Sequence, residues 1–248
     1  MRRLVKHLKG HSGARVSLYE KNNEYVVIKE NYSKARESVA ILNILPFPTP
    51  SIYEVSDTHI IMEYINGQDM ATYLELADKQ GINVLIDFLS RYIQWCLDNS
   101  EEYIFDKEIE KKLLDINNYI DLNSFAKNLK VPMPRSIIHG DFTLENIMYA
   151  NNKFYFIDAN PTDLNSIYFD ANKLRQDLDC LWFIRNKEEK VQHKIICNKI
   201  SRELKKQFHF MQNNTIMLLM LARILPYTKD ECTESFLLKE IQKLLKLV

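Results

Sequence analysis

Glycine is the residue that the sequence most lacks, with 5 in 248 residues, about 2% where roughly 7% is usual. This scarcity excludes a collagen-like or glycine-rich low-complexity chain. Because glycine enters left-handed backbone conformations without strain, we expect the few that remain to serve turns and close approaches: Gly10, Gly13, Gly67, Gly81 and Gly140. Hydrophobic residues make up 46% and charged residues 27%, the balance of a globular protein with a core.

An excess of one charge is also missing, since 33 basic and 33 acidic residues cancel. Without a summed positive field we expect no nucleic-acid partner. The longest apolar stretch, Thr215 to Leu225, contains Arg223 and is shorter than the roughly 18 residues of a membrane span; it predicts a buried helix and no membrane insertion. The four cysteines show neither pairing nor metal-ligand spacing, which predicts reduced thiols in a cytoplasmic protein.

The hydrophobic pattern changes near residue 66 and predicts two lobes. Before that point we expect a hairpin, a helix with Ser33 as its N-cap, and two further strands, at residues 14–29, 33–44, 51–55 and 59–64. Beyond it we expect helices at 70–79, 84–97 and 104–120, a hairpin at 147–157, and four helices after residue 166. The fold class is therefore α+β, with a small antiparallel sheet and one helix in residues 1–66 and a larger, mostly helical lobe in residues 67–248.

One segment carries a recognisable set of chemical groups, from Ile138 to Asp158. It contains His139 and Asp141, then Asn146 five residues after that Asp, then Asp158 twelve residues after the Asn. Phosphoryl transfer needs a carboxylate that orients and deprotonates the attacking hydroxyl, and an amide and a second carboxylate that hold Mg²⁺ on the nucleotide phosphates. The alternative is a polar turn followed by a hairpin, in which Asp141 and Asp158 are merely solvated.

This segment resembles the aminoglycoside phosphotransferase and choline kinase group, whose members have the bilobal protein-kinase-like fold. The resemblance is close over residues 137–175 and loose over the whole chain. It implies that Asp141 is the catalytic base and that Asn146 and Asp158 are magnesium ligands. It further implies that His139 is a structural member of the loop and that the later Asp170 is buried and braces the loop through its backbone.

The resemblance also gives residues 1–66 the role of a nucleotide-binding lobe. The apolar strand Val26 to Ile28 leads into Lys29, which would pair with the α- and β-phosphates. Glu37 on the following helix would hold Lys29 extended, although the spacing of eight residues is shorter than in most relatives. An exposed strand-end lysine is the alternative for Lys29.

Two further segments match parts of a nucleotide site, although each is weak alone. Gly10, Ser12 and Gly13 lie in a short glycine-containing loop before the first clear strand, and its N–H groups would cover the phosphates. Glu63 and Ile65 lie where the family has the hinge, whose backbone would meet adenine. A strand that ends in a glycine turn at Gly67 explains the second segment equally well.

Departures from the protein-kinase pattern narrow the class. Ala159 and Asn160 follow the metal Asp where a Phe-Gly pair would allow a switch, and Gly140 replaces the Arg of regulated kinases. Only eleven residues separate Asp158 from Asp170, too few for an ordinary activation segment and peptide platform. We therefore expect a Mg²⁺-dependent O-phosphotransferase that uses ATP or GTP and acts on a hydroxylated small molecule.

Only the resemblance indicates which molecule accepts the phosphoryl group, and it leaves several classes of acceptor open. The loop around Asp141 and the phrase from Ser166 to Leu174 resemble kinases of bacterial surface-polysaccharide pathways, which implies a sugar or amino sugar. Aminoglycoside or choline-type kinases, a small atypical protein kinase and a catalytically silent nucleotide-binding pseudokinase are the alternatives. An aminoglycoside acceptor would need an acidic pocket, for which Asp230, Glu231 and Glu234 are candidates, although a solvated helix start explains these acids as well. The sequence leaves the oligomeric state open.

Overall fold

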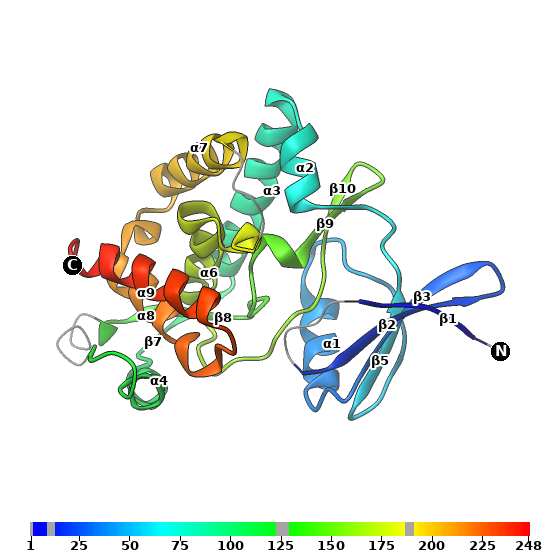
Figure 1. Ribbon diagram of the computed structural model, residues 1–248, viewed down its shortest axis with the longest axis horizontal. Coiled ribbons are helices and arrows are strands. Elements are labelled where there is room, and N and C mark those ends of the chain that lie inside the picture. The colour runs from blue at the N-terminus through cyan, green and yellow to red at the C-terminus, as the bar shows by residue number, and fades with distance from the viewer. Residues whose placement is uncertain (1, 9–12, 123–128, 187–190) are drawn as a thin grey trace. The chain divides into compact units, whose positions relative to one another are not determined.

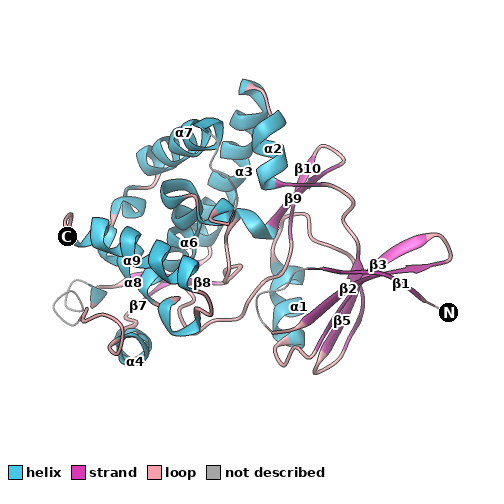
Figure 2. Cartoon of the chain, in the orientation of Figure 1, coloured by secondary structure: helices cyan, strands magenta, loops and turns pink. Residues whose placement is uncertain are grey.

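The structure is a computed structural model that describes residues 2–8, 13–122, 129–186 and 191–248 (Figure 1). The chain divides into two compact units. The first contains Met1–Met70 and Glu145–Pro161, and the second contains Ala71–Leu144 and Thr162–Val248. The predicted lobe boundary between residues 66 and 67 stays a prediction. Figure 2 shows that strands dominate the first unit and helices the second.

The first unit is built on a five-stranded antiparallel sheet with the order β1-β2-β3-β5-β4. The strands are β1 (Arg3–Leu8), β2 (Arg15–Lys21), β3 (Glu24–Glu30), β4 (Ile52–Val55) and β5 (His59–Glu63). Asn22 and Asn23 join β2 to β3 with φ angles of 53° and 64°. Two positive φ angles are typical of the turn that suits the twist of a two-residue hairpin, so the predicted hairpin is confirmed.

One helix packs on this sheet. Helix α1 (Ala35–Ile44) buries Ala35, Ser38, Val39 and Leu42. Of these, Ala35 and Val39 pack in a hydrophobic cluster with Tyr32 and Ile60. The helix is capped at Lys34 without a side-chain hydrogen bond, so the prediction of Ser33 as N-cap is wrong. It ends before Pro46, as expected, because proline lacks the N–H that a helix interior needs.

A second sheet of the first unit explains why residues 145–161 belong to it. Its three strands, in the order β10-β9-β6, are β6 (Gln68–Asp69), β9 (Ile147–Ala150) and β10 (Lys153–Phe156). Strand β6 pairs with β9 directly after Gly67. A Cβ on Gly67 would lie 2.4 Å from the carbonyl oxygen of Tyr149. Only glycine therefore permits this close approach of the two strands.

The second unit is helical and contains the larger core. Its helices are α2 (Met70–Leu76), α3 (Lys79–Asp98), α4 (Asp106–Ile116), α6 (Ile167–Cys180), α7 (Val191–Gln207), α8 (Asn214–Ala222) and α9 (Glu231–Leu245). It also contains a two-stranded antiparallel sheet of β7 (Ser100–Tyr103) and β8 (Met133–Ser136), which α4 separates along the chain. Helix α8 is buried from Thr215 to Ala222, which confirms the buried helix that its unbroken apolar sequence predicts. Within the described ranges, no helix has the length and apolar character needed to cross a bilayer.

Helix α6 departs from the usual division of polar and apolar residues. Its charged residues Asp170, Lys173, Arg175 and Asp177 are all buried, each at most 5% exposed. Buried charges are costly unless they are paired or hydrogen-bonded, so the partners of these side chains show what the helix does.

Candidate active site

The loop that carries Asp141 is held through its backbone by Asp170. The N–H of Gly140 donates to Oδ2 of Asp170 at 3.2 Å, and the N–H of Phe142 donates to Oδ1 at 3.2 Å. The hydroxyl of Tyr92, on α3, donates to Oδ2 of the same carboxylate at 2.7 Å and accepts the N–H of His139 at 2.7 Å. Asp170 is completely buried. The bracing role that the resemblance implied for Asp170 is therefore confirmed.

Two further residues of α6, which the sequence reasoning missed, hold the same loop. The ammonium of Lys173 donates to the carbonyl oxygen of Gly140, and the N–H of Leu144 donates to Oδ2 of Asp177 at 2.5 Å. Residues three and seven positions after Asp170 lie on the same face of a helix. Because charged residues are usually exposed, this spacing by itself did not distinguish them from a solvated helix face.

Burial and neighbouring charges shift the pKa values of two hydrogen-bond donors in this network, Tyr92 and Lys173. Burial and the neighbouring charge of Asp170 raise the pKa of Tyr92 well above its ordinary value, so the phenol keeps the proton that it donates. Burial lowers the pKa of Lys173, and the nearby Arg223 lowers it further, whereas the carboxylates of Asp170 and Asp141 oppose this shift. The ammonium nitrogen of Lys173 lies 3.7 Å from Oδ1 of Asp170.

The backbone around Asp141 is fixed by a left-handed glycine and by two hydrogen bonds. Gly140 has a φ angle of 79°, in the left-handed region that favours glycine. The N–H of Asp141 donates to Nδ1 of the buried His139 at 3.3 Å, and its carbonyl accepts the N–H of Thr143 at 2.8 Å. Asp141 itself is half-buried. The loop thus fixes the backbone on both sides of Asp141.

Lys29 and Asp158 form an ion pair in the first unit. The side chain of Lys29 is 3% exposed and that of Asp158 is 45% exposed. The ammonium nitrogen also lies 3.7 Å from the centre of the Tyr32 ring, a cation–π contact. Asp158 has a φ angle of 58°, an uncommon conformation for a residue with a side chain, and such strain gathers at functional sites.

Backbone hydrogen bonds place the second metal-ligand candidate next to Asp158 along the hairpin. The N–H of Ile157 donates to the carbonyl oxygen of Asn146 at 3.0 Å. On the other side of Asp158, the carbonyl of Ala159 accepts the hydroxyl of Ser38 at 2.5 Å and that of Tyr32 at 3.5 Å. The two candidates thus lie on neighbouring, tethered segments of one unit.

The donor set of these two residues suits Mg²⁺. A carboxylate and an amide offer oxygen ligands, and Mg²⁺ in nucleotide enzymes commonly takes one or two carboxylates together with phosphate oxygens. In the part of the chain that the structure describes, no three His, Cys, Asp or Glu side chains gather as a metal cluster. Asp158 and Asn146 are thus the residues of this unit whose side chains could hold Mg²⁺ on a bound nucleotide.

The expected pair between Lys29 and Glu37 is not formed. Glu37 lies exposed in the first turn of α1, whereas the next residue, Ser38, is buried and bonds to Ala159. One residue corresponds to about 100° around a helix, so Glu37 faces solvent when Ser38 faces the hairpin. The ion-pair partner of Lys29 is Asp158 instead.

The structure describes three of the five remaining residues predicted to bind the nucleotide. Gly10 and Ser12 lie outside the described residues, and Gly13 has a φ angle of 77°. Glu63 accepts the N–H and the hydroxyl of Ser51 at 3.0 and 2.9 Å, and its own N–H donates to the Ser51 carbonyl at 2.9 Å. Contact of Glu63 with adenine would therefore have to use its carbonyl oxygen. Ile65 is buried.

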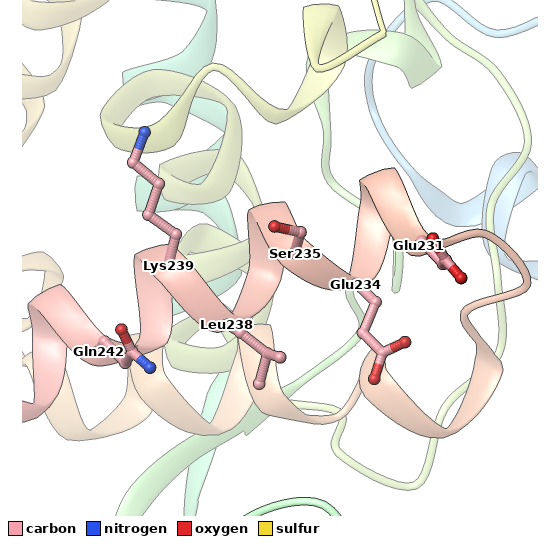
Figure 3. Close-up of a pocket in the computed structure, with 6 residues that line it drawn as sticks. All are labelled: Glu231, Glu234, Ser235, Leu238, Lys239 and Gln242. Atoms are coloured by element: carbon pink, nitrogen blue, oxygen red, sulfur yellow. The ribbon is translucent and has the colours of Figure 1, made fainter.

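The acidic residues near the C-terminus form the start of a helix. Oδ1 of Asp230 accepts the N–H of Thr233 at 2.8 Å, and this bond holds the pKa of Asp230 below its ordinary value. A surface hollow of about 350 Å³ lies along α9, lined by Glu231, Glu234, Ser235, Leu238, Lys239 and Gln242. Figure 3 shows these side chains projecting from successive turns of the single helix α9, so the hollow is a feature of one helix surface.

Comparison with solved structures identifies the fold. A thermostable mutant of aminoglycoside phosphotransferase APH(4)-Ia in its apo form matches with a TM-score of 0.67 and 9% identity, over 98% of this chain and 94% of that chain. A ternary complex of a mutant of the same enzyme with AMP-PNP and hygromycin B matches with a TM-score of 0.68 and 9% identity, over 98% and 93%. The streptomycin–ATP ternary complex of APH(2″)-IIa matches with a TM-score of 0.59 and 15% identity, over 98% and 91%.

These likenesses show that the chain has the protein-kinase-like fold of the aminoglycoside phosphotransferases. The predicted fold class is thereby confirmed. No protein-family model and no curated protein matches the chain in sequence.

Proposed function

We propose that the protein is a kinase that transfers the γ-phosphoryl group of ATP to a hydroxyl of a small molecule, with a sugar or amino sugar as acceptor. The observation that carries the proposal is the network of buried charges on α6, which holds the backbone of the loop around Asp141 at three N–H groups and one carbonyl. Burying charges to order one loop is expensive. It is understandable where the loop must present a catalytic carboxylate in a fixed position.

The proposed roles follow from the chemistry of each side chain. Asp141 accepts the proton of the acceptor hydroxyl as the new O–P bond forms and the bond to the leaving ADP breaks. Lys29 binds the nucleotide phosphates, for which it exchanges its present partner Asp158. Asn146 and Asp158 would hold Mg²⁺, which supplies charge neutralisation on the phosphates when bound.

The solved structures with the same fold support this choice. Two of them hold ATP or AMP-PNP together with hygromycin B or streptomycin, which are small hydroxylated molecules. Because one fold can host many functions, the fold supports a kinase only together with the residues of the site. We further propose a cytoplasmic location and a preference for ATP, with GTP as the alternative nucleotide.

A panel of acceptors tests the proposal. Turnover of ATP and of GTP is measured with Mg²⁺, and with EDTA in its place, in the presence of neutral sugars, amino sugars, acidic sugars, aminoglycosides, choline and a mixture of proteins. We expect Mg²⁺-dependent ADP release that one class of small molecule stimulates. Stimulation by protein alone would indicate an atypical protein kinase, and tight ATP binding without any turnover would indicate a pseudokinase.

Replacement of the proposed base gives the sharpest single prediction. Asp141→Asn keeps the size of the side chain but cannot accept the proton, so we expect kcat to fall by about 10²–10⁴-fold. Nucleotide affinity should stay unchanged, as measured by calorimetric titration with ATP. Asp87→Asn is the matched control, because Asp87 lies on α3 and only pairs with Arg91 at 2.9 Å in solvent. Unaltered turnover in Asp141→Asn would contradict the assignment.

A further inference from the structure

Arg223, at the C-terminal end of α8, has no hydrogen bond or ion pair for its side chain among the described residues. Its Nε atom is enclosed and bonds to nothing, and no described residue forms an ion pair or side-chain hydrogen bond with its guanidinium. The buried Arg175, in contrast, has hydrogen-bond partners for its whole guanidinium. Its guanidinium binds the side chains of Asp179, Asn172 and Asn214 and the carbonyl of Asn213.

The position of Arg223 follows from the packing of α6 against α8. The amide of Gln176 donates to the carbonyl oxygen of Met220 at 2.6 Å, which fixes these two helices together. Arg223 lies three residues beyond Met220, and Lys173 lies three residues before Gln176. Burial lowers the pKa of Arg223, whereas the carboxylates of Asp141 and Asp170 raise it. Arg223 is therefore a close electrostatic neighbour of Asp141, within the same unit.

The nearby carboxylates favour the charged form of Arg223, but no described residue accepts a hydrogen bond from its guanidinium. A buried charge without a hydrogen-bonded partner destabilises a protein, and the ammonium of Lys173 adds a second positive charge nearby. The residue as a whole is only half-buried, although its Nε atom is enclosed. Arginine is also the side chain best shaped to bind a carboxylate or phosphate through two parallel hydrogen bonds.

We propose that Arg223 binds an oxyanion of the phosphate acceptor, so that the substrate class is a sugar or related alcohol that carries a carboxylate or a phosphate. This inference rests on the proposed function of Asp141 as the base that meets the acceptor hydroxyl. The anion belongs to the acceptor and not to the nucleotide because the residues proposed for the nucleotide phosphates and metal, Lys29, Asn146 and Asp158, all belong to the first unit. A polycationic aminoglycoside would be repelled at this position.

Acceptors that differ only in charge test the proposal. We measure kcat/KM with glucose, glucuronate and glucose 6-phosphate, at constant ionic strength, for the wild type and for Arg223→Gln, Arg223→Lys and Arg202→Gln. Arg202 is the matched control, since it is exposed on α7 and its loss changes the net charge equally. We expect the wild type to prefer an anionic acceptor to glucose by about 10–10³-fold. Arg223→Gln should lose this preference through the acceptor KM, Arg223→Lys should keep part of it, and Arg202→Gln should keep all of it.

Two results would overturn the inference. One is a wild type that treats charged and neutral acceptors alike or prefers aminoglycosides. The other is an Arg223→Gln variant that slows every acceptor equally, because Arg223 would then act on the transferred phosphoryl group.

A binding measurement separates this inference from the proposed function. Thermal unfolding is followed in inorganic phosphate and in chloride of equal ionic strength, without nucleotide. We expect phosphate to raise the midpoint of the wild type and of Arg202→Gln more than that of Arg223→Gln. If no acceptor supports turnover, the proposed function fails, yet this difference would still support an anion site at Arg223. Equal shifts in all three proteins would contradict the site.

Discussion

Two buried lysines, one in each unit, are held in opposite ways. Lys29 on β3 pairs with Asp158, a carboxylate whose side chain is 45% exposed. Lys173 on α6 lies beside Asp170, whose carboxylate is completely buried, and donates to the backbone of Gly140. Both ammonium groups are hidden from water, but only the partner of Lys29 can be solvated if the pair separates.

This difference indicates which charges move during the proposed reaction. Separating Lys29 from Asp158 leaves a carboxylate in contact with solvent, so a nucleotide phosphate can replace it at little cost. Separating Lys173 from its partners leaves a buried carboxylate and a buried carbonyl, which costs far more. We infer that Lys29 exchanges partners on ligand binding and that Lys173 does not. Three substitutions test this contrast and a fourth tests another buried ion pair of α6, and we rank all four by their effect on the free energy of unfolding.

Removal of the fully buried carboxylate should have the largest effect. Asp170→Ala leaves the N–H groups of Gly140 and Phe142 and the hydroxyl of Tyr92 without their acceptor. Breaking a buried charged network by deleting one member destabilises by about 3–5 kcal/mol, and we expect this loss in urea denaturation. Asp163→Ala is the control, since Asp163 is exposed and only meets Lys111 at 3.4 Å. A loss below about 1 kcal/mol would show that Asp170 does not organise the loop.

Lys173→Met should rank second. It removes the donor to Gly140 while keeping most of the buried volume, and we expect a loss of about 1.5–3 kcal/mol, the range for hydrogen bonds to charged groups. The turnover number should also fall with little change in the KM for ATP, because the backbone next to Asp141 is released. Lys205→Met is the control. Lys205, on α7, also pairs with a carboxylate of α6, but that carboxylate is Asp179, near the C-terminal end of the helix, at 2.7 Å. Equal turnover in both variants would contradict a positioning role for Lys173.

Local patterns made the loop and the hairpins predictable from the sequence. The segment from His139 to Asp158 carries its chemistry in consecutive residues, and the pair Asn22-Asn23 favours one kind of turn. Helix α8 is apolar on all sides and can only be buried. In each case the information lies within a few residues, so a single sequence contains it.

The partners of the site residues could not be predicted because they are distant in the chain. Whether Lys29 meets Glu37 or Asp158 depends on the rotation of α1, and a difference of one residue turned Ser38 inward instead of Glu37. The roles of Lys173 and Asp177 depend on the loop lying against that face of α6, about 30 residues away in sequence. Charged residues are usually exposed, so α6 gave no local sign that its charges were buried.

Asp179→Asn should rank third and depend on pH. Burial alone would raise the pKa of Asp179, but Arg175 and Lys205 outweigh burial and hold the pKa below its ordinary value of 3.8. A carboxylate whose pKa is depressed on folding contributes stability that is complete above the ordinary pKa and is lost as the pH falls through the folded value. We therefore expect a loss of about 1–2 kcal/mol at pH 7 that shrinks below pH 3.8 in urea denaturation. Asp115→Asn, which affects an exposed pair with Lys112, should show no such pH dependence.

Lys29→Met should have the smallest effect on stability, although it removes a residue that we place in the nucleotide site. The methionine can fill the same space against the Tyr32 ring, and the carboxylate left behind at Asp158 is half-exposed and can be hydrated. We expect a change of about 1 kcal/mol or less in urea denaturation, together with at least a tenfold loss of ATP affinity in calorimetric titration. A destabilisation as large as that of Lys173→Met would mean that the two lysines are equally fixed. Unchanged ATP affinity would mean that Lys29 is a structural residue only, so either result would remove the contrast between a lysine that exchanges its partner and one that holds the loop in place.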